Sequence, residues 1–365
     1  MRKRIGAIVD IDSLDELDAL LAAGATRMAG WRIQDVDLRG RTDALLTLDP
    51  RGAVLLGCDI TETTHRHLTT GGALIFPDLP ELPFDTYRAR LYTPDELYAE
   101  IDTEPYSRTP DALIYAWSRQ RDRDATRRMA QALHDHAVDA ALEEQLAGAR
   151  TVGVMGGHAV NRGDDDYRRA ARLGYRLART DLGVMTGGGP GAMEATNLGA
   201  SLSSYDDATL DDAIEMLAAA PTFRPSVTRW ARVAFAVRAR WPEHGHSLGI
   251  PTWFYGHEPP NAFATGIAKY FQNSVREDTL LRHCDAGIVF LPGAAGTVQE
   301  IFQDACENYY ADRATVAPMV LVGSGYWTDQ VPVWPLLRRL GDGRPMARCL
   351  HLVDDLDEAV EIIRP

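Results

Sequence analysis

The 365-residue sequence has little cysteine, almost no lysine and no long apolar run. Its four cysteines are far apart and form no CxxC pair, which argues against a zinc site or a disulfide framework. No stretch approaches the ~18 apolar residues of a transmembrane span. The first apolar run is broken by Asp10 and Asp12, which is unlike a signal peptide. We therefore expect a cytoplasmic protein that has no membrane partner.

An excess of basic charge is also missing. The chain has 38 Lys and Arg against 52 Asp and Glu, a formal net charge of −14. Binding to nucleic acid or to an anionic membrane needs a basic face, so we expect no nucleic-acid partner. An anionic small molecule remains possible, because local backbone amides and arginines decide whether it binds.

The first 105 residues have the pattern of a small α/β domain, for which we expect a regulatory role. A helix is predicted over 14–23, and short strands over 53–58 and 73–76, with Gly71-Gly72 as a turn. Six prolines fall between residues 77 and 110, which predicts an irregular connection between two domains.

Residues 106–365 are predicted to form a second, larger domain. After a helical stretch over 111–147, strand and helix patterns alternate, which is typical of a doubly wound, parallel, Rossmann-like sheet with helices on both faces. Such sheets bind ligands at the carboxyl ends of their strands. The strands are expected at 151–155, 183–185, 248–254, 286–291 and 319–322, and helices at 167–179 and 192–200.

A helical insert at 201–247 interrupts this alternation and is rich in arginine. Two interpretations remain open: a solvated helix face, or arginines that reach a substrate phosphate. The arginines concerned are Arg224, Arg229, Arg232, Arg238 and Arg240.

Two glycine-rich turns lie between a predicted strand and a predicted helix. In MTGGGPGAMEATNLGA (185–200), the missing Cβ atoms would let an anion approach the backbone and the helix N-terminus. In VFLPGAAGTVQEIFQ (289–303), Thr297 and Glu300 lie three residues apart and so share one helix face. The first of these turns fits neither GxGxxG nor the P-loop pattern, and it could also be a purely structural turn. Glu300 could also cap its own helix.

The motifs TGGGPGAMEA with Asn197, and PGxxGTxxE at 292–300, resemble the paired signature of the LONELY GUY (LOG) family. Its members are phosphoribohydrolases, and a broader branch acts as nucleotide 5′-monophosphate nucleosidases. The resemblance covers about residues 150–330. It implies release of a free base and ribose 5-phosphate from a nucleoside 5′-monophosphate such as AMP. It further implies a homo-oligomer, a dimer or larger, and no metal or cofactor is required.

The resemblance also implies roles for particular residues. Glu300 and Arg276 are the expected catalytic pair: a fixed carboxylate would stabilise the positive charge on the ribose ring, and the guanidinium would orient it or hold phosphate. Arg276 could alternatively be a surface residue paired with Glu277 and Asp278. The expected substrate-binding and phosphate-binding residues are Gly156, Gly157, Gly187, Gly188, Gly189, Gly191, Met193, Glu194, Asn197, Gly293, Gly296 and Thr297.

The sequence departs from the family pattern at two places. Ala294 stands where the family has glycine, so a methyl group could crowd the phosphate or forbid a positive φ. His158 stands in the Gly156-Gly157 turn where many relatives have serine, either as a phosphate donor or as an exposed loop residue.

Three other functions compete with the hydrolase. A noncatalytic nucleotide sensor on the same fold is the main alternative, although a sensor has no use for Glu300 near the anomeric carbon. A pyridoxal-phosphate decarboxylase needs a Schiff-base lysine. Lys269 is the one candidate beyond the N-terminus, and its surroundings predict an ordinary helix. A pure scaffold leaves both glycine turns unexplained.

Overall fold

The structure is a computed structural model that describes residues 9–79, 82–120, 125–254, 258–312 and 315–364. The chain divides into two compact units. One comprises Met1–Arg90 with Asp124–Ala141, and the other comprises Leu91–Arg123 with Leu142–Pro365. The helix α6 (Ala125–Gln145) contributes residues to both units. The regulatory role suggested by an extra N-terminal domain stays a prediction.

The first unit contains a parallel four-stranded sheet in the order β1-β2-β3-β4. Helix α1 begins after Ser13, whose side chain accepts a hydrogen bond from the backbone of Glu16 and so caps the helix. The predicted helix, turn and two later strands are present, whereas β1 and β2 are not predicted from the sequence. The elements are β1 (Val9–Ile11), α1 (Leu14–Ala22), β2 (Trp31–Gln34), α2 (Thr42–Leu45), β3 (Val54–Leu56), α3 (Glu62–Thr70) and β4 (Leu74–Phe76).

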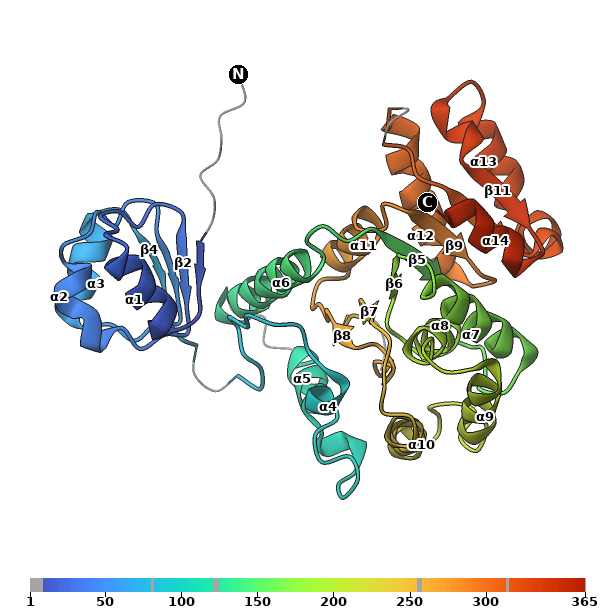
Figure 1. Ribbon diagram of the computed structural model, residues 1–365, viewed down its shortest axis with the longest axis horizontal. Coiled ribbons are helices and arrows are strands. Elements are labelled where there is room, and N and C mark those ends of the chain that lie inside the picture. Colours follow the sequence, from blue (N-terminus) through green and yellow to red (C-terminus); the bar gives the residue numbers. More distant parts are fainter. Residues whose placement is uncertain (1–8, 80–81, 121–124, 255–257, 313–314, 365) are drawn as a thin grey trace. The chain divides into compact units, whose positions relative to one another are not determined.

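The second unit contains a seven-stranded sheet in the order β11-β10-β9-β5-β6-β7-β8, and every pair is parallel (Figure 1). The predicted parallel, Rossmann-like α/β fold is therefore confirmed. The strands are β5 (Thr151–Met155), β6 (Gly183–Thr186), β7 (Ser247–Gly249), β8 (Gly266–Ile267), β9 (Gly287–Phe290), β10 (Met319–Val322) and β11 (Leu350–Val353).

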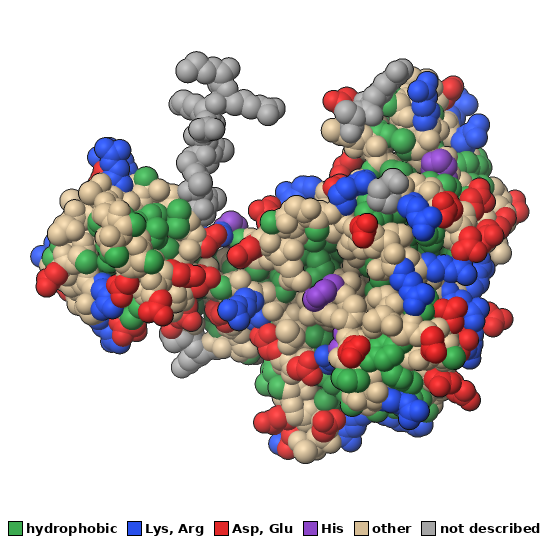
Figure 2. All heavy atoms as spheres, viewed as in Figure 1, with side chains coloured by type: hydrophobic (Ala, Val, Ile, Leu, Met, Phe, Trp, Pro, Cys, Tyr) green, Lys and Arg blue, Asp and Glu red, His purple; other side chains and the backbone are tan. Residues whose placement is uncertain are grey.

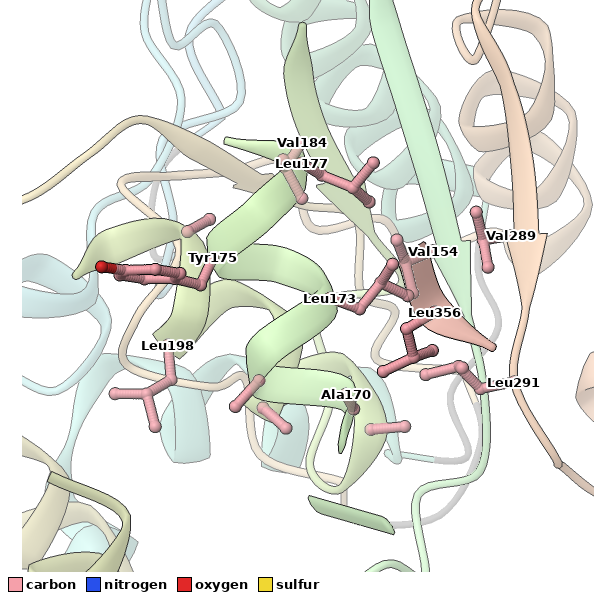
Figure 3. Packing of buried hydrophobic residues seen from close by; sticks show 14 of the residues in the cluster. Val154, Ala170, Leu173, Tyr175, Leu177, Val184, Leu198, Val289, Leu291 and Leu356 are labelled. Carbon is pink, nitrogen blue, oxygen red and sulfur yellow. The ribbon is translucent and has the colours of Figure 1, made fainter. Parts of the chain in front are cut away.

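Helices cover this sheet on both faces. On one face, α7, α8 and α14 bury apolar side chains against the strands, and Figure 3 shows Leu173 and Leu356 close to Val154. On the other face, Gly153 of β5 packs against Cys284, which follows α11. The alternation of Val154 and Gly153 is the period of two that strands impose. The helices are α4 (Pro94–Leu97), α5 (Pro110–Ser118), α7 (Asp165–Leu177), α8 (Ala192–Ser201), α9 (Asp207–Leu217), α10 (Val227–Arg240), α11 (Asn273–Arg282), α12 (Ala295–Tyr310), α13 (Trp334–Gly341) and α14 (Leu356–Ile363).

Two sequence-based expectations need correction. The stretch around Lys269 is not a helix: it contains β8, which pairs with β7 and bridges to Tyr92, so long-range strand pairing overrides the local pattern. The strand expected over 248–254 ends at Gly249, because Pro251 has no N–H to continue the ladder, although Thr252 still forms an isolated bridge with Tyr270. The helical insert at 201–247 is present as α9 and α10.

Charges of both signs are interspersed over the face of the molecule seen in Figure 2. In the part of the chain that the structure describes, none of the helices combines the length and the apolar character needed to cross a membrane.

Candidate functional site

A cavity lies where the sheet of the second unit reverses its direction of growth. From β5 the chain adds β6, β7 and β8 on one side, and β9 then pairs with β5 on the other. Met155 is in register with Phe290, and Val154 with Thr186, so the three central strands end together. Each of these strands leads into a glycine turn. A crevice at such a switch point is where open α/β sheets bind ligands.

The cavity has a volume of about 440 Å³, which is within the range of small-molecule sites. Its wall combines the glycine turns that follow β5, β6 and β9 with residues of α11 and α12. Nine of the residues expected from the sequence line it, namely Gly156, Gly157, Gly187, Gly189, Met193, Arg276, Gly296, Thr297 and Glu300.

Arg276 and Glu300 meet at this cavity. Nη1 of Arg276 lies 3.3 Å from Oε1 of Glu300, and the same nitrogen lies 2.6 Å from Oε1 of Glu277. Nε of Arg276 donates to the carbonyl oxygen of Ile250, 2.6 Å away, just beyond β7. Both Arg276 and Glu300 are 7% exposed, so the interpretation of Arg276 as a surface residue is wrong. Glu300 bonds Arg276 rather than the start of its own helix, so the capping interpretation is wrong as well.

Burial controls the protonation of Glu300. Loss of water raises its pKa to about 7, the Arg276 charge opposes this rise, and the Glu277 charge adds to it. A carboxyl group whose pKa lies near neutrality is suited to proton transfer or to a charge that is switched on above pH 7.

The start of α12 supplies free backbone donors to the same cavity. Residues Ala295, Gly296 and Thr297 form its first turn, where the N–H groups have no acceptor inside the helix. These donors and the positive end of the helix dipole favour an anion. Ala294, which precedes them, has φ −93°, so this position needs no glycine conformation. The backbone at Ala294 is therefore unstrained with alanine in this position.

The glycine turn between β6 and α8 is shaped by its protein neighbours. A Cβ on Gly187 would collide with Nη2 of Arg276, so the missing side chain makes room for the guanidinium. Gly191 precedes α8 with φ +74°, and a Cβ there would strike the backbone of His158. The amide of Ala192 already donates to the carbonyl of Gly157. Part of this turn is therefore committed to the fold rather than open to a ligand.

Five of the expected binding residues do not line the cavity, and two of these hold the turns from behind. Glu194 is buried and accepts hydrogen bonds from Arg162 and Tyr167. Asn197 accepts hydrogen bonds from Thr186 and Asn261. The other three are Gly188, Gly191 and Gly293. A direct role in binding stays a prediction for all five.

A side cavity of about 290 Å³ shares His158 and Glu258 with the main one. Nδ1 of His158 lies 3.4 Å from Oε1 of Glu258, and both side chains are partly exposed. Arg224 of the insert lines this side cavity. By contrast, Arg232 and Arg238 bind within the fold, to the carbonyl of Ile101 and to the carboxylate of Asp95.

Sequence reasoning missed several residues of the main cavity. The sequence predicts Glu277 only as a surface partner of Arg276, yet it is 3% exposed and lines the cavity. The sequence does carry one signal for Glu277. Asn273 lies four residues earlier, so the two polar side chains share one face of α11, and this face is buried. Thr252 and Gln299 carry no such signal. Among the described residues, no group of three or more His, Cys, Asp or Glu side chains is arranged to hold a metal ion.

Lys269 does not line either cavity. Its Nζ lies 2.6 Å from Oδ1 of Asp111, and burial lowers the pKa of the ammonium group. Trp253 donates a hydrogen bond to the same carboxylate oxygen. Lys269 is thus part of a buried ion pair rather than a candidate for a Schiff base.

Comparison with known proteins gave one family match and several structural similarities. The first solved structure is that of TM1055 (21% identity, 58% of this chain and 98% of that chain covered, TM-score 0.36). A second is a molybdenum cofactor binding protein from the phototrophic bacterium Rippkaea orientalis (16% identity, 59% of this chain and 95% of that chain covered, TM-score 0.36). A third is the molybdenum cofactor carrier protein from Chlamydomonas reinhardtii (16% identity, 59% of this chain and 96% of that chain covered, TM-score 0.36). No curated protein matched the chain. Residues 149–204, which carry β5, α7, β6 and α8 with their two glycine turns, match the model of the SLOG cluster4 family.

Proposed function

We propose that this protein hydrolyses the N-glycosidic bond of a nucleoside 5′-monophosphate and releases the free base and ribose 5-phosphate. The observation that carries the proposal is the buried pair of Arg276 and Glu300 in a cavity that is also lined by the glycine turns. The family resemblance of the two motifs points to the same reaction.

The reaction needs a negative charge beside the ribose ring. As the bond from C1′ to the base breaks, positive charge develops on the ring, and a fixed carboxylate stabilises it. Glu300 would supply this charge once it is ionised. Arg276 would hold the carboxylate in place through Nη1, while Ile250 fixes the guanidinium from the other side.

The start of α12, one helical turn before Glu300, would hold the phosphate. The amides of the first turn of α12 and the hydroxyl of Thr297 are donors of the kind that phosphate oxygens accept. One molecule would therefore be held by its phosphate at the helix N-terminus and by its ribose at Glu300.

The second candidate is a noncatalytic nucleotide sensor on the same fold. It is favoured by the protonation of Glu300: with a pKa of about 7, half of the molecules lack the charge at neutral pH. A sensor would bind the nucleotide at the same helix N-terminus and leave its glycosidic bond intact.

Incubation with AMP, GMP, IMP, CMP and UMP at pH 8, followed by chromatography of free bases, separates the two candidates. We expect at least one base to be released with an equal amount of ribose 5-phosphate. Nucleotide binding by calorimetry without any base release would favour the sensor. Neither binding nor release of any of the five would contradict both.

A further inference from the structure

Glu277 is a buried carboxyl group of the cavity to which the hydrolysis proposed above gives no role. It lies on α11 directly after Arg276, and its side chain lines the same cavity as Glu300. At 3% exposed it is buried more deeply than either of them. Full burial of a charged group is costly unless the group is paired, so its contacts indicate what it does.

One oxygen of Glu277 is held and the other is not. Oε1 accepts hydrogen bonds from Nη1 of Arg276, 2.6 Å away, and from Nδ2 of Asn273, 3.3 Å away. Oε2 is buried and has no hydrogen-bond partner among the described residues. A buried acceptor without a donor is costly, so Oε2 is the carboxylate oxygen whose capacity to accept a proton is unused.

Glu277 and Glu300 are joined through a single nitrogen. Oε1 of each carboxyl group contacts Nη1 of Arg276, so the two groups share one end of the guanidinium. Enzymes that cleave glycosidic bonds use two carboxyl groups with different tasks, one facing the sugar cation and one handling a proton. The two carboxyl groups of this cavity also have different contacts. Glu277 has the shorter ion pair with Arg276 and accepts a further hydrogen bond from Asn273, which Glu300 does not.

We propose that Glu277 is a second catalytic residue, the general base that activates the attacking water. This inference rests on the proposed function. Oε2 takes a proton from water, the water oxygen forms a bond to C1′, and the bond from C1′ to the base breaks. The electron pair of that bond goes to the base nitrogen, which takes a proton from solvent, and Glu277 later returns its own proton to solvent. Glu300 faces the ribose cation throughout.

A purely structural role for Glu277 and a role as general base predict different effects of an added nucleophile on a variant that lacks this carboxylate. If Glu277 only held Arg276 in place, its loss would disturb the guanidinium and Glu300 together, and no added nucleophile could restore the reaction. If it is the general base, an anionic nucleophile that needs no deprotonation can replace the activated water.

The test is base release from AMP, or from the best of the five nucleotides, by Glu277→Ala with and without sodium azide. In water we expect a loss of about 10²- to 10⁴-fold in kcat, the usual contribution of a general base. Azide should restore release and yield 1-azidoribose 5-phosphate, in which the azide nitrogen has formed the bond to C1′. Binding of ribose 5-phosphate should change less than about threefold. Glu307→Ala, an exposed carboxyl group on α12, is the matched control and should match the wild type with and without azide.

Two results would overturn the role of Glu277 while leaving the hydrolase intact: kcat of the alanine variant within tenfold of the wild type, or a large loss that azide does not relieve. An absence of base release by the wild type would instead overturn the proposed function, and the role of Glu277 with it. Glu277→Gln keeps the side-chain volume and shows whether the cavity stays folded. It should lose release as the alanine variant does, without rescue, because the amide occupies the space that azide needs.

Discussion

Replacing Glu300 with glutamine should stabilise the protein by an amount that grows with pH. The folded state raises the pKa of Glu300 from 4.5 to about 7, so between these values the folded protein holds a proton that the unfolded chain has lost. Stability therefore falls as pH rises through this window. At ~1.4 kcal/mol per pKa unit, the full cost of ionising Glu300 is about 3 kcal/mol. Glutamine is neutral at every pH and avoids this cost.

The measurement is urea unfolding of the wild type and Glu300→Gln at pH 5, 6, 7 and 8, followed by tryptophan fluorescence. We expect the variant to be more stable by less than about 1 kcal/mol at pH 5 and by about 3 kcal/mol at pH 8. Other buried carboxyl groups, such as Asp304, titrate in both proteins and cancel in the difference. Glu215→Gln on the exposed side of α9 is the control and should stay within about 0.5 kcal/mol of the wild type throughout. An equal stability difference at all four pH values, or a destabilised variant at pH 8, would refute the assigned burial cost.

Three further predictions concern activity and assembly. Since the reaction needs the ionised form of Glu300, kcat/KM of the wild type should rise between pH 6 and pH 8 and level off above; a profile that falls over this range would contradict the role of the carboxylate. Gly187→Ala would place a methyl group on the guanidinium of Arg276 and should abolish base release, whereas a Cβ on Gly296 would meet no atom within 4 Å, so Gly296→Ala should fold as the wild type does by circular dichroism. The chain should form a homo-oligomer through a surface that includes Tyr310, which is 80% exposed at the end of α12, and a monomer by light scattering at micromolar concentration would refute this.

The parallel fold was predictable because its central strands are buried on both faces and therefore form short, nearly uninterrupted apolar runs in the sequence. The bounds of β5 and β10 could be assigned from apolar runs that are flanked by glycine or proline. The strands β1 and β2 were missed because three or four residues carry too little pattern to stand out. The error around Lys269 has another origin, since β8 exists through its pairing with β7 and its bridge to Tyr92, which lies far away in the sequence.

The candidate site was predictable in outline and not in detail. Two glycine turns and Glu300 could be located from sequence, since parallel strands bring their carboxyl ends to one edge of the sheet. The roles of the motif residues behind the turns could not. Glu194 is held by Arg162 and Asn197 by Asn261, and neither partner is near in sequence.

Glu277 could not be placed from sequence for a similar reason. Adjacent charged residues on a helix usually point in different directions, and one of them reaches solvent. On α11 both Arg276 and Glu277 are buried, because the start of this helix lies between the end of β7 and α12. The arrangement is visible only once these elements are packed.

The most direct test of the proposed mechanism is the ratio of turnover to binding in Glu300→Gln, with Thr297→Ala as the matched variant from the same helix face. For the nucleotide that the wild type cleaves best, we expect Glu300→Gln to bind with a Kd within about threefold of the wild type while kcat falls by about a hundredfold, the usual effect of losing one well-placed electrostatic contact. Thr297→Ala should show the reverse, with binding weakened by about tenfold through the lost hydrogen bond to phosphate and kcat nearly unchanged. Full turnover by Glu300→Gln would contradict the central claim that this carboxylate drives the cleavage.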